Sequence, residues 1–444
     1  MKNYDLIAGK VWIMGTKVLL VGSGGREDAV ARELVKSGAS VYSAVKNRNP
    51  SIISLSQEHI VCDETDFRRI HEFAMEKKVD LAFIGPDPVL ETELVEKLMS
   101  SGIPVASPDR KAAMIETSKE FMRDLMARYS IPGNIPSSIF RSSGDLENFL
   151  LKNEKEYAIK PIGLTGGKGV KVMGDQIRTV EEAVDYGSTI IGRDGKVLLE
   201  ERAAGEEFSL QVFTDGTHVK PMPVVQDFKR AHENDTGPNT GGMGSISGPE
   251  GLPFIRKKSV EKALDIIMSI VDALRKEGSP FRGVLYGQFM ETAEGPVVIE
   301  INSRFADPES MNVLSLIESN ICDIFYGIAQ GNLDMKVEFE KKATVLKYIV
   351  PRGYGTKPEP GVLTVERKSL PGNMRLYYAA VSGTLERVEM STSRSLALVG
   401  IADSIPEASD IVEENLHLVK GNYYVRHDIG SREMMNRKMS GKRT

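Results

Sequence analysis

A short, entirely apolar run near the start of the chain is followed at once by a glycine-rich turn. Residues 18–21 read VLLV and residues 22–25 read GSGG, before a charged, amphipathic stretch that begins at Arg26. An uninterrupted apolar strand needs cover on both faces, which is typical of a parallel sheet. A glycine turn that opens a helix suits a phosphate, because its free backbone amides can point at the anion. The first domain is therefore expected to be an open α/β domain.

The pattern of alternating strand and helix continues to about residue 118. Further strands are expected at 41–45, 81–84 and 104–106, with helices at about 26–36 and 91–99. A dinucleotide site would need glycine at position 27 and an acidic residue after the second strand. Glu27 stands at the first position, and Lys46, Asn47 and Arg48 follow the strand. We therefore expect this turn to accept a sugar phosphate rather than NAD, and a tight turn without a ligand is the alternative.

The second region, residues 119–330, contains a glycine-rich loop between two expected strands. The strands lie at 157–160 and 170–173, and the loop spans 163–169. This order is strand–loop–strand, and Gly169 follows Lys168 where a P-loop requires Ser or Thr. The loop is expected to be a hairpin lid over a nucleotide, within a lid segment of about residues 119–195. The other strands expected in this region are 197–200, 208–214, 219–225, 284–290 and 297–302.

The final region, residues 331–430, is expected to be rich in strands, at 343–350, 375–381, 396–402 and 423–426. The chain after Asp428 is basic and poor in apolar residues, so the tail at 431–444 is expected to fray. Residues 1–16 look like an extension before the first strand. We hypothesise that Met14 is an alternative or true start, which the intact mass of the native protein would decide.

Composition limits the classes of function. The net charge of −5 argues against a dedicated nucleic-acid binder. Cys62 and Cys322 are too far apart in sequence to suggest a disulfide framework or a CxxC metal site, and two reduced cysteines suit a cytoplasmic protein. No apolar run approaches the length of a bilayer span. We expect small-molecule partners, no nucleic acid, no membrane, and a monomer or weak dimer.

Three oxygen-bearing side chains near residue 300 are candidate metal ligands. Glu300 and Asn302 lie two apart on an expected strand, so they share a face. Gln288, on the preceding strand, is a possible third ligand for the same pocket. Oxygen ligands suit Mg²⁺ or Mn²⁺, which bridge phosphates. A solvent-facing polar row on an edge strand explains the same pattern equally well.

Two further groups of residues suit a nucleotide. Lys160 and Lys168 flank the glycine loop, where they are placed to neutralise phosphate oxygens. The segment LLEERAAGEEF contains the end of an expected strand, at Glu200, Glu201 and Arg202. Backbone groups at that strand end would meet adenine, and one of its acids would bind ribose hydroxyls. A charged, solvated turn is the simpler explanation of this segment.

The segment from Gln226 to Gly244 reads QDFKRAHENDTGPNTGGMG. Glycines at this density lower strand and helix stability, and they usually allow close backbone approach to a ligand. A flexible surface loop is the alternative on composition alone.

The motifs together resemble the phosphoribosylamine–glycine ligase family of the ATP-grasp superfamily, over nearly the whole chain from Lys17 to Asp428. The most specific segments are DTGPNTGGMG and, after it, EINSRFADPE; VGSGGRE, GPDPVLETELVEKL and IKPIGLTGGKGVKV add support. The resemblance implies an α/β and α+β multidomain fold: a Rossmann-like domain at 17–118, an ATP-grasp domain at 119–330 with a glycine-rich lid, and a β-rich domain at 331–430.

The resemblance also implies roles residue by residue. Metal ligands would be Glu300, Asn302 and Gln288, binding Mg²⁺ or Mn²⁺. ATP contacts would come from Lys119, Lys160, Lys168, Glu200, Glu201 and Glu207. Substrate contacts would come from Gly24, Gly25 and Asp87 on the phosphoribosylamine side, and from Asp235, Gly242 and Arg304 on the glycine and acyl-phosphate side. Lys229 and Asp307 would also contact substrate. Arg304, Lys160 and Lys168 would take part in the chemistry.

The implied reaction joins glycine to 5-phosphoribosylamine with ATP, through a glycyl phosphate, as a step of purine biosynthesis. Four positions depart from the family pattern, which puts the fine substrate contacts in doubt: Asp28, Phe228, Ala306 and Met311. Two alternatives remain open: a purine-pathway carboxylase of the same superfamily, and a nucleotide-binding module without catalysis. An NAD-dependent oxidoreductase is disfavoured by Glu27 and by the missing acidic residue for the ribose.

Overall fold

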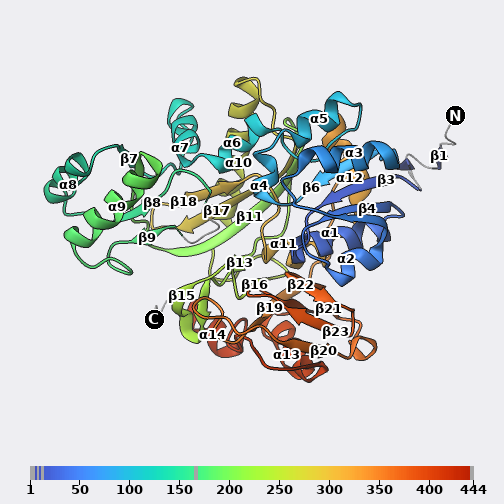
Figure 1. Cartoon of the computed structure of the whole chain (residues 1–444). Helices are drawn as coiled ribbons and strands as arrows, with labels where there is room; N and C mark the ends of the chain where they lie inside the picture. The colour runs from blue at the N-terminus through green and yellow to red at the C-terminus, as the bar shows by residue number, and fades with distance from the viewer. Residues whose placement is uncertain (1–5, 8–9, 12–14, 165–168, 441–444) are drawn as a thin grey trace.

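The computed structural model describes residues 6–7, 10–11, 15–164 and 169–440. Figure 1 shows an N-terminal α/β domain in blue, a central region in green and yellow, and a C-terminal region in orange and red. A two-stranded ribbon of β1 (Leu6–Ile7) and β2 (Lys10–Val11) precedes the first domain. In the described part of the chain, no helix is both long and apolar enough to cross a membrane.

The N-terminal domain is the expected open parallel sheet. Its strand order is β5-β4-β3-β6, and all three pairings are parallel. The strands are β3 (Lys17–Val21), β4 (Ser40–Val45), β5 (Ser56–Val61) and β6 (Leu81–Ile84). The helices are α1 (Gly25–Lys36), α2 (Pro50–Leu55), α3 (Phe67–Lys77), α4 (Asp87–Leu90), α5 (Leu94–Ser100) and α6 (Arg110–Thr117). The strand expected at 104–106 is reduced to one bridge between Val105 and Ala82.

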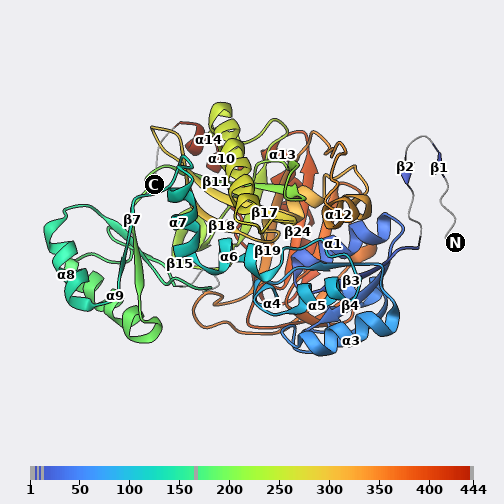
Figure 2. The same ribbon diagram turned by 90° about the horizontal axis from the view of Figure 1, so that it is seen from above.

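A smaller lobe stands apart from the rest of the molecule, as Figure 2 shows on its left side. Its antiparallel sheet has the order β7-β10-β8-β9 and its own apolar core. Its elements are β7 (Ser137–Phe140), α8 (Ser143–Lys152), β8 (Tyr157–Lys160), β9 (Lys171–Val172), α9 (Val180–Asp194) and β10 (Val197–Glu201). Helix α7 (Lys119–Arg128) instead buries Met122, Leu125 and Met126 in the main core. The separate lobe therefore begins after α7.

The central sheet is antiparallel, in the order β12-β11-β17-β18, and α10 (Lys257–Lys276) packs against it. Its strands are β11 (Glu206–Thr214), β12 (Val219–Pro221), β17 (Gly283–Glu291) and β18 (Pro296–Asn302). The strand expected at 219–225 is interrupted: β12 ends at Pro221, and Val225 pairs with Ser209 of β11 only as an isolated bridge. Helices α11 (Glu309–Leu314) and α12 (Ile321–Gln330) follow β18.

The glycine-rich segment 226–244 leaves the central sheet and joins the C-terminal one. Its strands are β13 (Gln226–Asp227), β14 (Arg230–His232), β15 (Thr236–Asn239) and β16 (Gly244–Ser247). Strand β16 pairs with β19 (Ala343–Pro351), so the segment extends the C-terminal sheet. Gly244 has no room for a side chain there, because an added Cβ would lie 2.2 Å from the Leu346 carbonyl oxygen.

The C-terminal region contains two sheets. The first continues from β19 through β24 (Leu396–Ala402) to β21 (Met374–Tyr378), and β26 (Tyr423–Tyr424) also pairs with β19. The second has the order β22-β23-β20-β25. Its strands are β22 (Val381–Gly383), β23 (Arg387–Met390), β20 (Val362–Val365) and β25 (Val419–Lys420). Helix α13 (Ile405–Asn415) packs on β24 of the first sheet. The expected β-rich character is confirmed.

The expectation that the chain frays after Asp428 is wrong for residues 429–439. Ile429 is fully buried, and α14 (Arg432–Met439) packs Met434 and Met435 into the main core. Ser431 caps the helix by accepting a hydrogen bond from the Met434 amide. Lys438 forms an ion pair with Glu206 at 2.8 Å. The composition of this segment led to the wrong expectation because two methionines are enough to anchor a short helix in the core.

Candidate functional site

The candidate metal ligands lie together at the end of β18. Asn302 Nδ2 donates to Glu300 Oε1 at 3.1 Å, so the two side chains share a face as expected. Gln288 on β17 pairs directly with Glu300 in the strand register. The register shifts at Ile299, which is an extra residue on β18. Such a bulge re-aims the backbone and leaves groups free for other partners.

The Gln288 side chain fits a cation at this position. Gln288 is buried, and its Nε2 donates to Glu207. Its Oε1 has no hydrogen-bond partner among the described residues. A buried acceptor without a partner costs about 1–3 kcal/mol, and an ion beside it would remove that cost. In the described part of the chain no group of three His, Cys, Asp or Glu suits a metal. Glu300, Asn302 and Gln288 are the set that fits, through carboxylate and amide oxygens.

Lysines set the charge around Glu300. Burial raises the pKa of Glu300, but Lys229, the Asn302 hydrogen bond, Lys160 and Lys119 together lower it below its ordinary value. Burial lowers the pKa of Lys119, with Glu300 opposing that shift. Lys119 Nζ also donates to the Gly163 carbonyl at 2.9 Å, beside the glycine-rich loop. The structure therefore brings Lys119, Lys160 and Lys229 to one carboxylate. Lys168 lies outside the described residues.

Lys160 is held by a buried network that sequence reasoning missed. Its Nζ lies 2.6 Å from Glu200 Oε2, and Arg123 Nε lies 2.7 Å from Glu200 Oε1. Arg123 Nη2 also donates to the carbonyls of Val298, at 2.8 Å, and Ile299, at 3.2 Å. The bulge thus supplies a backbone acceptor at Ile299. Glu200 points into this network, whereas the resemblance implied a contact to ATP.

The two other acids of the expected nucleotide segment are more open. Glu201, at the end of β10, forms an ion pair with Lys155 at 2.5 Å. Glu207, on β11, lies 3.3 Å from Lys229 Nζ. Burial lowers the pKa of Lys229, but Asp227, Glu207 and Glu300 outweigh that effect and hold it above its ordinary value. Lys229 is therefore a fixed positive charge at the site.

A second buried acid near Lys229 was also missed. Burial, followed by the charge of Asp227, raises the pKa of Glu309 to about 8. Glu309 hydrogen-bonds Tyr286, on β17, and is 2% exposed. Burial raises the pKa of Asp227 as well, against the opposing charge of Lys229. Asp227 and Glu309 therefore titrate as a pair, beside the positive charge of Lys229.

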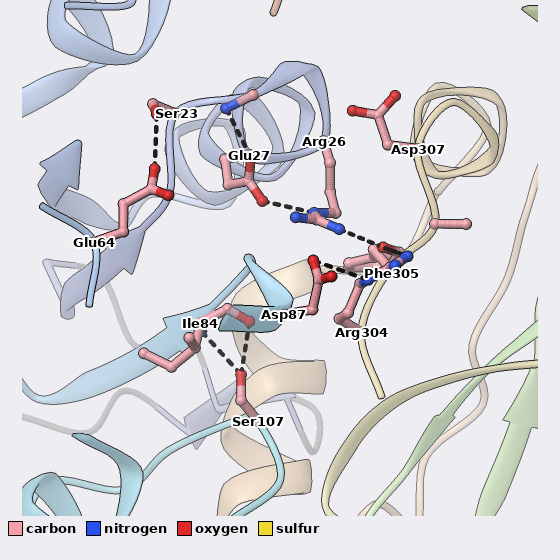
Figure 3. A network of polar contacts seen from close by, with 12 residues as sticks. Ser23, Arg26, Glu27, Glu64, Ile84, Asp87, Ser107, Arg304, Phe305 and Asp307 are labelled. Atoms are coloured by element: carbon pink, nitrogen blue, oxygen red, sulfur yellow. Dashed lines mark hydrogen bonds and ion pairs between the residues drawn. The ribbon is translucent and has the colours of Figure 1, made fainter. Parts of the chain in front are cut away.

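The glycine turn at the start of α1 is closed by its own side chains, as Figure 3 shows. The Gly24 amide donates to Glu27 Oε2 at 2.8 Å, and Arg26 Nε donates to Glu27 Oε1 at 2.6 Å. A Cβ on Gly85 would lie 2.1 Å from Glu27 Oε1, so Glu27 fills the space where a larger residue would stand. A Cβ on Gly25 would lie 2.8 Å from the Tyr348 hydroxyl. Gly25 therefore serves close packing against the C-terminal region.

Asp87 and Arg304 face each other across the end of the parallel sheet (Figure 3). Arg304 Nε lies 3.7 Å from Asp87 Oδ1, and Arg304 Nη2 lies 3.0 Å from Glu116 Oε1. Burial raises the pKa of Asp87, but Arg304 and Arg26 lower it below its ordinary value overall. An aspartate from the N-terminal domain and an arginine from the loop after β18 thus lie close together.

Asp307, at the end of the same loop, and Gly242 lie beside side chains of the C-terminal region. The Tyr348 hydroxyl donates to Asp307 Oδ1 at 2.6 Å, and Arg394 Nη1 lies 3.1 Å from the same oxygen. Arg394 also donates to the Gly241 carbonyl. Gly242 has φ +110, and an added Cβ would lie 2.8 Å from Pro308 Cδ. Only glycine fits this position without strain.

Asp235 lies in the turn between β14 and β15, where Arg426 Nη1 approaches it at 2.8 Å. Arg426 is fully buried and also pairs with Asp428 at 2.6 Å. Asp235 thus joins the glycine-rich segment to the C-terminal end of the chain.

Two of the four residues that depart from the family pattern, Asp28 and Phe228, make contacts inside the protein. Asp28 Oδ2 accepts the Tyr378 amide at 2.8 Å, which ties α1 to β21. Phe228 is buried beneath Arg426 and Lys438, each within 6 Å of its ring, at 5.5 and 5.6 Å. The contacts of Asp28 and Phe228 lie within the protein, so these two departures from the family pattern affect packing between regions of the chain.

Two family models match the chain in succession. Residues 16–116 match the phosphoribosylglycinamide synthetase N domain, and residues 117–310 match the ATP-grasp (A) domain of the same synthetase. The phosphoribosylamine–glycine ligase of Thermococcus gammatolerans is 46% identical over 426 residues, covering 95% of this chain and 96% of the relative. That of Methanothermobacter thermautotrophicus is 46% identical over 433 residues, covering 95% and 98%.

Solved structures agree with the sequence relatives. The crystal structure of phosphoribosylamine–glycine ligase from Thermotoga maritima superposes with a TM-score of 0.78 at 26% identity, covering 93% of this chain and all of that chain. Biotin carboxylase from Campylobacter jejuni, at 15% identity and a TM-score of 0.76 over 96% of this chain and 97% of that one, shows a shared fold alone.

Proposed function

The chain belongs to the phosphoribosylglycinamide synthetase family, and we propose that the residues gathered at the end of β18 form its catalytic site. It is an ATP-dependent ligase that joins glycine to 5-phosphoribosylamine and gives glycinamide ribonucleotide, ADP and phosphate, a step of purine biosynthesis. The observation that supports this site most strongly is the meeting of Glu300, Asn302 and the unpartnered Gln288 Oε1 with Lys119, Lys160 and Lys229.

The proposed chemistry has two steps. A carboxylate oxygen of glycine attacks the γ-phosphorus of ATP, the bond to the bridging oxygen breaks, and ADP leaves. The ribosylamine nitrogen then attacks the acyl carbon of glycyl phosphate, loses a proton, and phosphate departs. The first step brings an anion to a polyanion, so it depends on charge neutralisation and in-line positioning more than on a strong base.

Each group of residues then has a proposed task. Mg²⁺ or Mn²⁺ held by Glu300, Asn302 and Gln288 would neutralise phosphate charge. Lys119, Lys160 and Lys168 would neutralise the rest, with Glu201 and Glu207 at the adenine and ribose side and Glu200 acting through Lys160. Gly24, Gly25 and Asp87 would bind the phosphoribosylamine. Lys229, Gly242, Arg304 and Asp307 would bind glycine and the acyl phosphate, and Asp235 would act through the turn that Arg426 holds.

The lobe from β7 to β10 is the proposed lid. It has its own core and carries Lys160 at the end of β8. Glycyl phosphate hydrolyses readily, so closure of a lid over the site would protect it from water. The free, buried thiols of Cys62 and Cys322 support a cytoplasmic location within the same proposal. A monomer or weak dimer remains the proposed assembly.

An isotope experiment tests the acyl-phosphate route. Glycine labelled with ¹⁸O in its carboxylate is supplied with ATP and phosphoribosylamine generated in the assay, and the released phosphate is analysed by mass spectrometry. Transfer of one labelled oxygen to phosphate is expected, because the attacking oxygen leaves with the phosphorus. Unlabelled phosphate with normal product formation would contradict the route.

A further inference from the structure

The loop of residues 303–307, which follows β18, is held from two sides. On the N-terminal side, Arg26 Nη1 donates to the Phe305 carbonyl at 2.9 Å, as Figure 3 shows. On the C-terminal side, Arg394 Nη1 donates to the Asp307 carbonyl at 3.0 Å. Arg304 directly precedes the first anchored residue, Phe305. Its position is therefore set by neighbours rather than by the flexibility of its own side chain.

Glu116, near the end of α6, divides its two carboxylate oxygens between the loop backbone and Arg304. Its Oε2 accepts the Ser303 amide at 2.8 Å and the Ser303 hydroxyl at 2.7 Å. Its Oε1 lies 3.0 Å from Arg304 Nη2. Glu116 is 5% exposed. A buried carboxylate with one oxygen bound twice by Ser303 has little freedom to follow Arg304 into another orientation.

The Arg304 guanidinium is oriented without being saturated. Its Nη2 forms the ion pair with Glu116, and its Nη1 donates to the Phe305 carbonyl at 3.3 Å. Its Nε is buried and has no hydrogen-bond partner among the described residues, and at 3.7 Å Asp87 Oδ1 is beyond hydrogen-bond range. A buried N–H without a partner is rare and costly, so it points to a ligand that completes it.

We propose that Glu116 is a positioning residue, which holds Arg304 so that its free donor edge faces the acyl phosphate formed during the reaction. This inference rests on the role of Arg304 in the proposed function. Glu116 belongs to the domain that also contains Asp87 and the glycine turn, on the phosphoribosylamine side. The same domain thereby positions the phosphoribosylamine nucleophile and the arginine that stabilises the acyl phosphate. The two reactants are therefore held in a fixed position relative to each other.

A double-mutant cycle separates this role from a purely structural one. Glu116→Gln keeps an oxygen for Ser303 and removes the charge that holds Arg304. With metal and all three substrates present, kcat is expected to fall about 10- to 100-fold while the KM for ATP changes by about twofold or less. In an Arg304→Met background, Glu116→Gln is expected to change kcat by about twofold or less, because its target is gone.

Ser303→Ala is the matched control, because it removes one hydrogen bond from the same carboxylate and leaves the ion pair to Arg304. It is expected to lower the melting temperature and to leave kcat within about twofold of the wild type. Should Glu116→Gln fail to fold, Glu116→Asp keeps the charge but is too short to serve both Ser303 and Arg304, and the same cycle applies to it.

Two results would overturn the inference: an unchanged kcat in Glu116→Gln, or an equal loss of kcat with and without Arg304. Wild-type enzyme is assayed in parallel for glycine-dependent ADP release. If the wild type shows no glycine-dependent ADP release, the proposed function itself is contradicted. If the wild type turns over normally but Glu116→Gln lowers kcat equally with and without Arg304, only the role of Glu116 is contradicted.

Discussion

The Lys160 ammonium lies 2.6 Å from the Glu200 carboxylate, and the Arg123 guanidinium lies 2.7 Å from the same group. All three side chains are buried. They join α7 to β8 and β10, and Arg123 extends the network to the carbonyls of β18. The lysine proposed to meet ATP is therefore positioned by the junction between the smaller lobe and the main body.

Glu200→Gln is expected to lower the free energy of unfolding by about 3–5 kcal/mol at pH 7, because it leaves two buried cations without a counter-charge. Urea unfolding followed by circular dichroism measures the change. Glu201→Gln is the matched control, because Glu201 pairs with Lys155 at the surface one residue away. The control is expected to cost less than about 1 kcal/mol. Equal effects would contradict the network.

The effect of Glu200→Gln is also expected to depend on pH. Burial raises the pKa of Glu200, but Lys160 and Arg123 lower it to about 2 from an ordinary value of 4.5. A lowered folded-state pKa means that the stabilisation is complete above pH 4.5 and is lost as pH falls toward about 2. The stabilities of wild type and variant should therefore converge in that window. A gap that stays constant on acidification would argue against the ion pair.

Glu300→Ala is expected to abolish turnover while leaving the fold largely intact. The side chain is a proposed metal ligand, and its neighbours on β18 remain paired to β17 without it. Mn²⁺ binding by calorimetry and ADP release together provide the test, with circular dichroism to confirm folding. Full activity at saturating Mg²⁺ is the outcome that rules out the metal assignment.

Lys119→Ala is expected to raise the KM for ATP about tenfold and to affect the KM for glycine much less, because one charged donor to phosphate is lost. Lys119 lies beside the glycine-rich loop through its contact with Gly163. Lys111→Ala, at an exposed lysine on α6, is the control. Steady-state kinetics with each substrate varied in turn decide the matter, and equal changes for both substrates would remove Lys119 from the ATP site.

Glu309→Gln is expected to gain stability relative to the wild type as pH rises. Burial and Asp227 raise the pKa of Glu309 to about 8, so the native state keeps a proton that the unfolded chain releases above 4.5. The corresponding stabilisation is complete below pH 4.5 and is lost as pH rises through about 8. Lys229 and Tyr286 face the same carboxyl group, and Asp227 titrates with it. Denaturant unfolding between about pH 5 and 9 measures the difference in stability between variant and wild type. A difference that does not change with pH would contradict the prediction.

Much of this architecture was predictable because its signals are local. The apolar run at 18–21 predicts a buried parallel strand, and the strand is β3. The spacing of Glu300 and Asn302 predicts a shared face, and the two side chains are hydrogen-bonded. Period and turn chemistry operate over a few residues, so a single sequence contains them.

The parts that could not be predicted depend on long-range contacts. Arg123 is 77 residues from Glu200, and Glu116 is 187 residues from Ser303. Neither pairing has a sequence spacing that would reveal it. The bulge at Ile299 is also invisible in the alternating pattern of β18, yet it supplies the carbonyl that Arg123 and Lys160 share. Helix α14 escaped notice because charge dominates its composition while two methionines bury it.

The measurement that tests the central claim most directly is ADP release with phosphoribosylamine generated in the assay, with and without glycine, followed by mass detection of the product. Glycine-dependent ADP release, in step with formation of glycinamide ribonucleotide, is the predicted result. ATP turnover that ignores glycine and follows bicarbonate or another acid would contradict it, because the same fold would then be serving a different substrate.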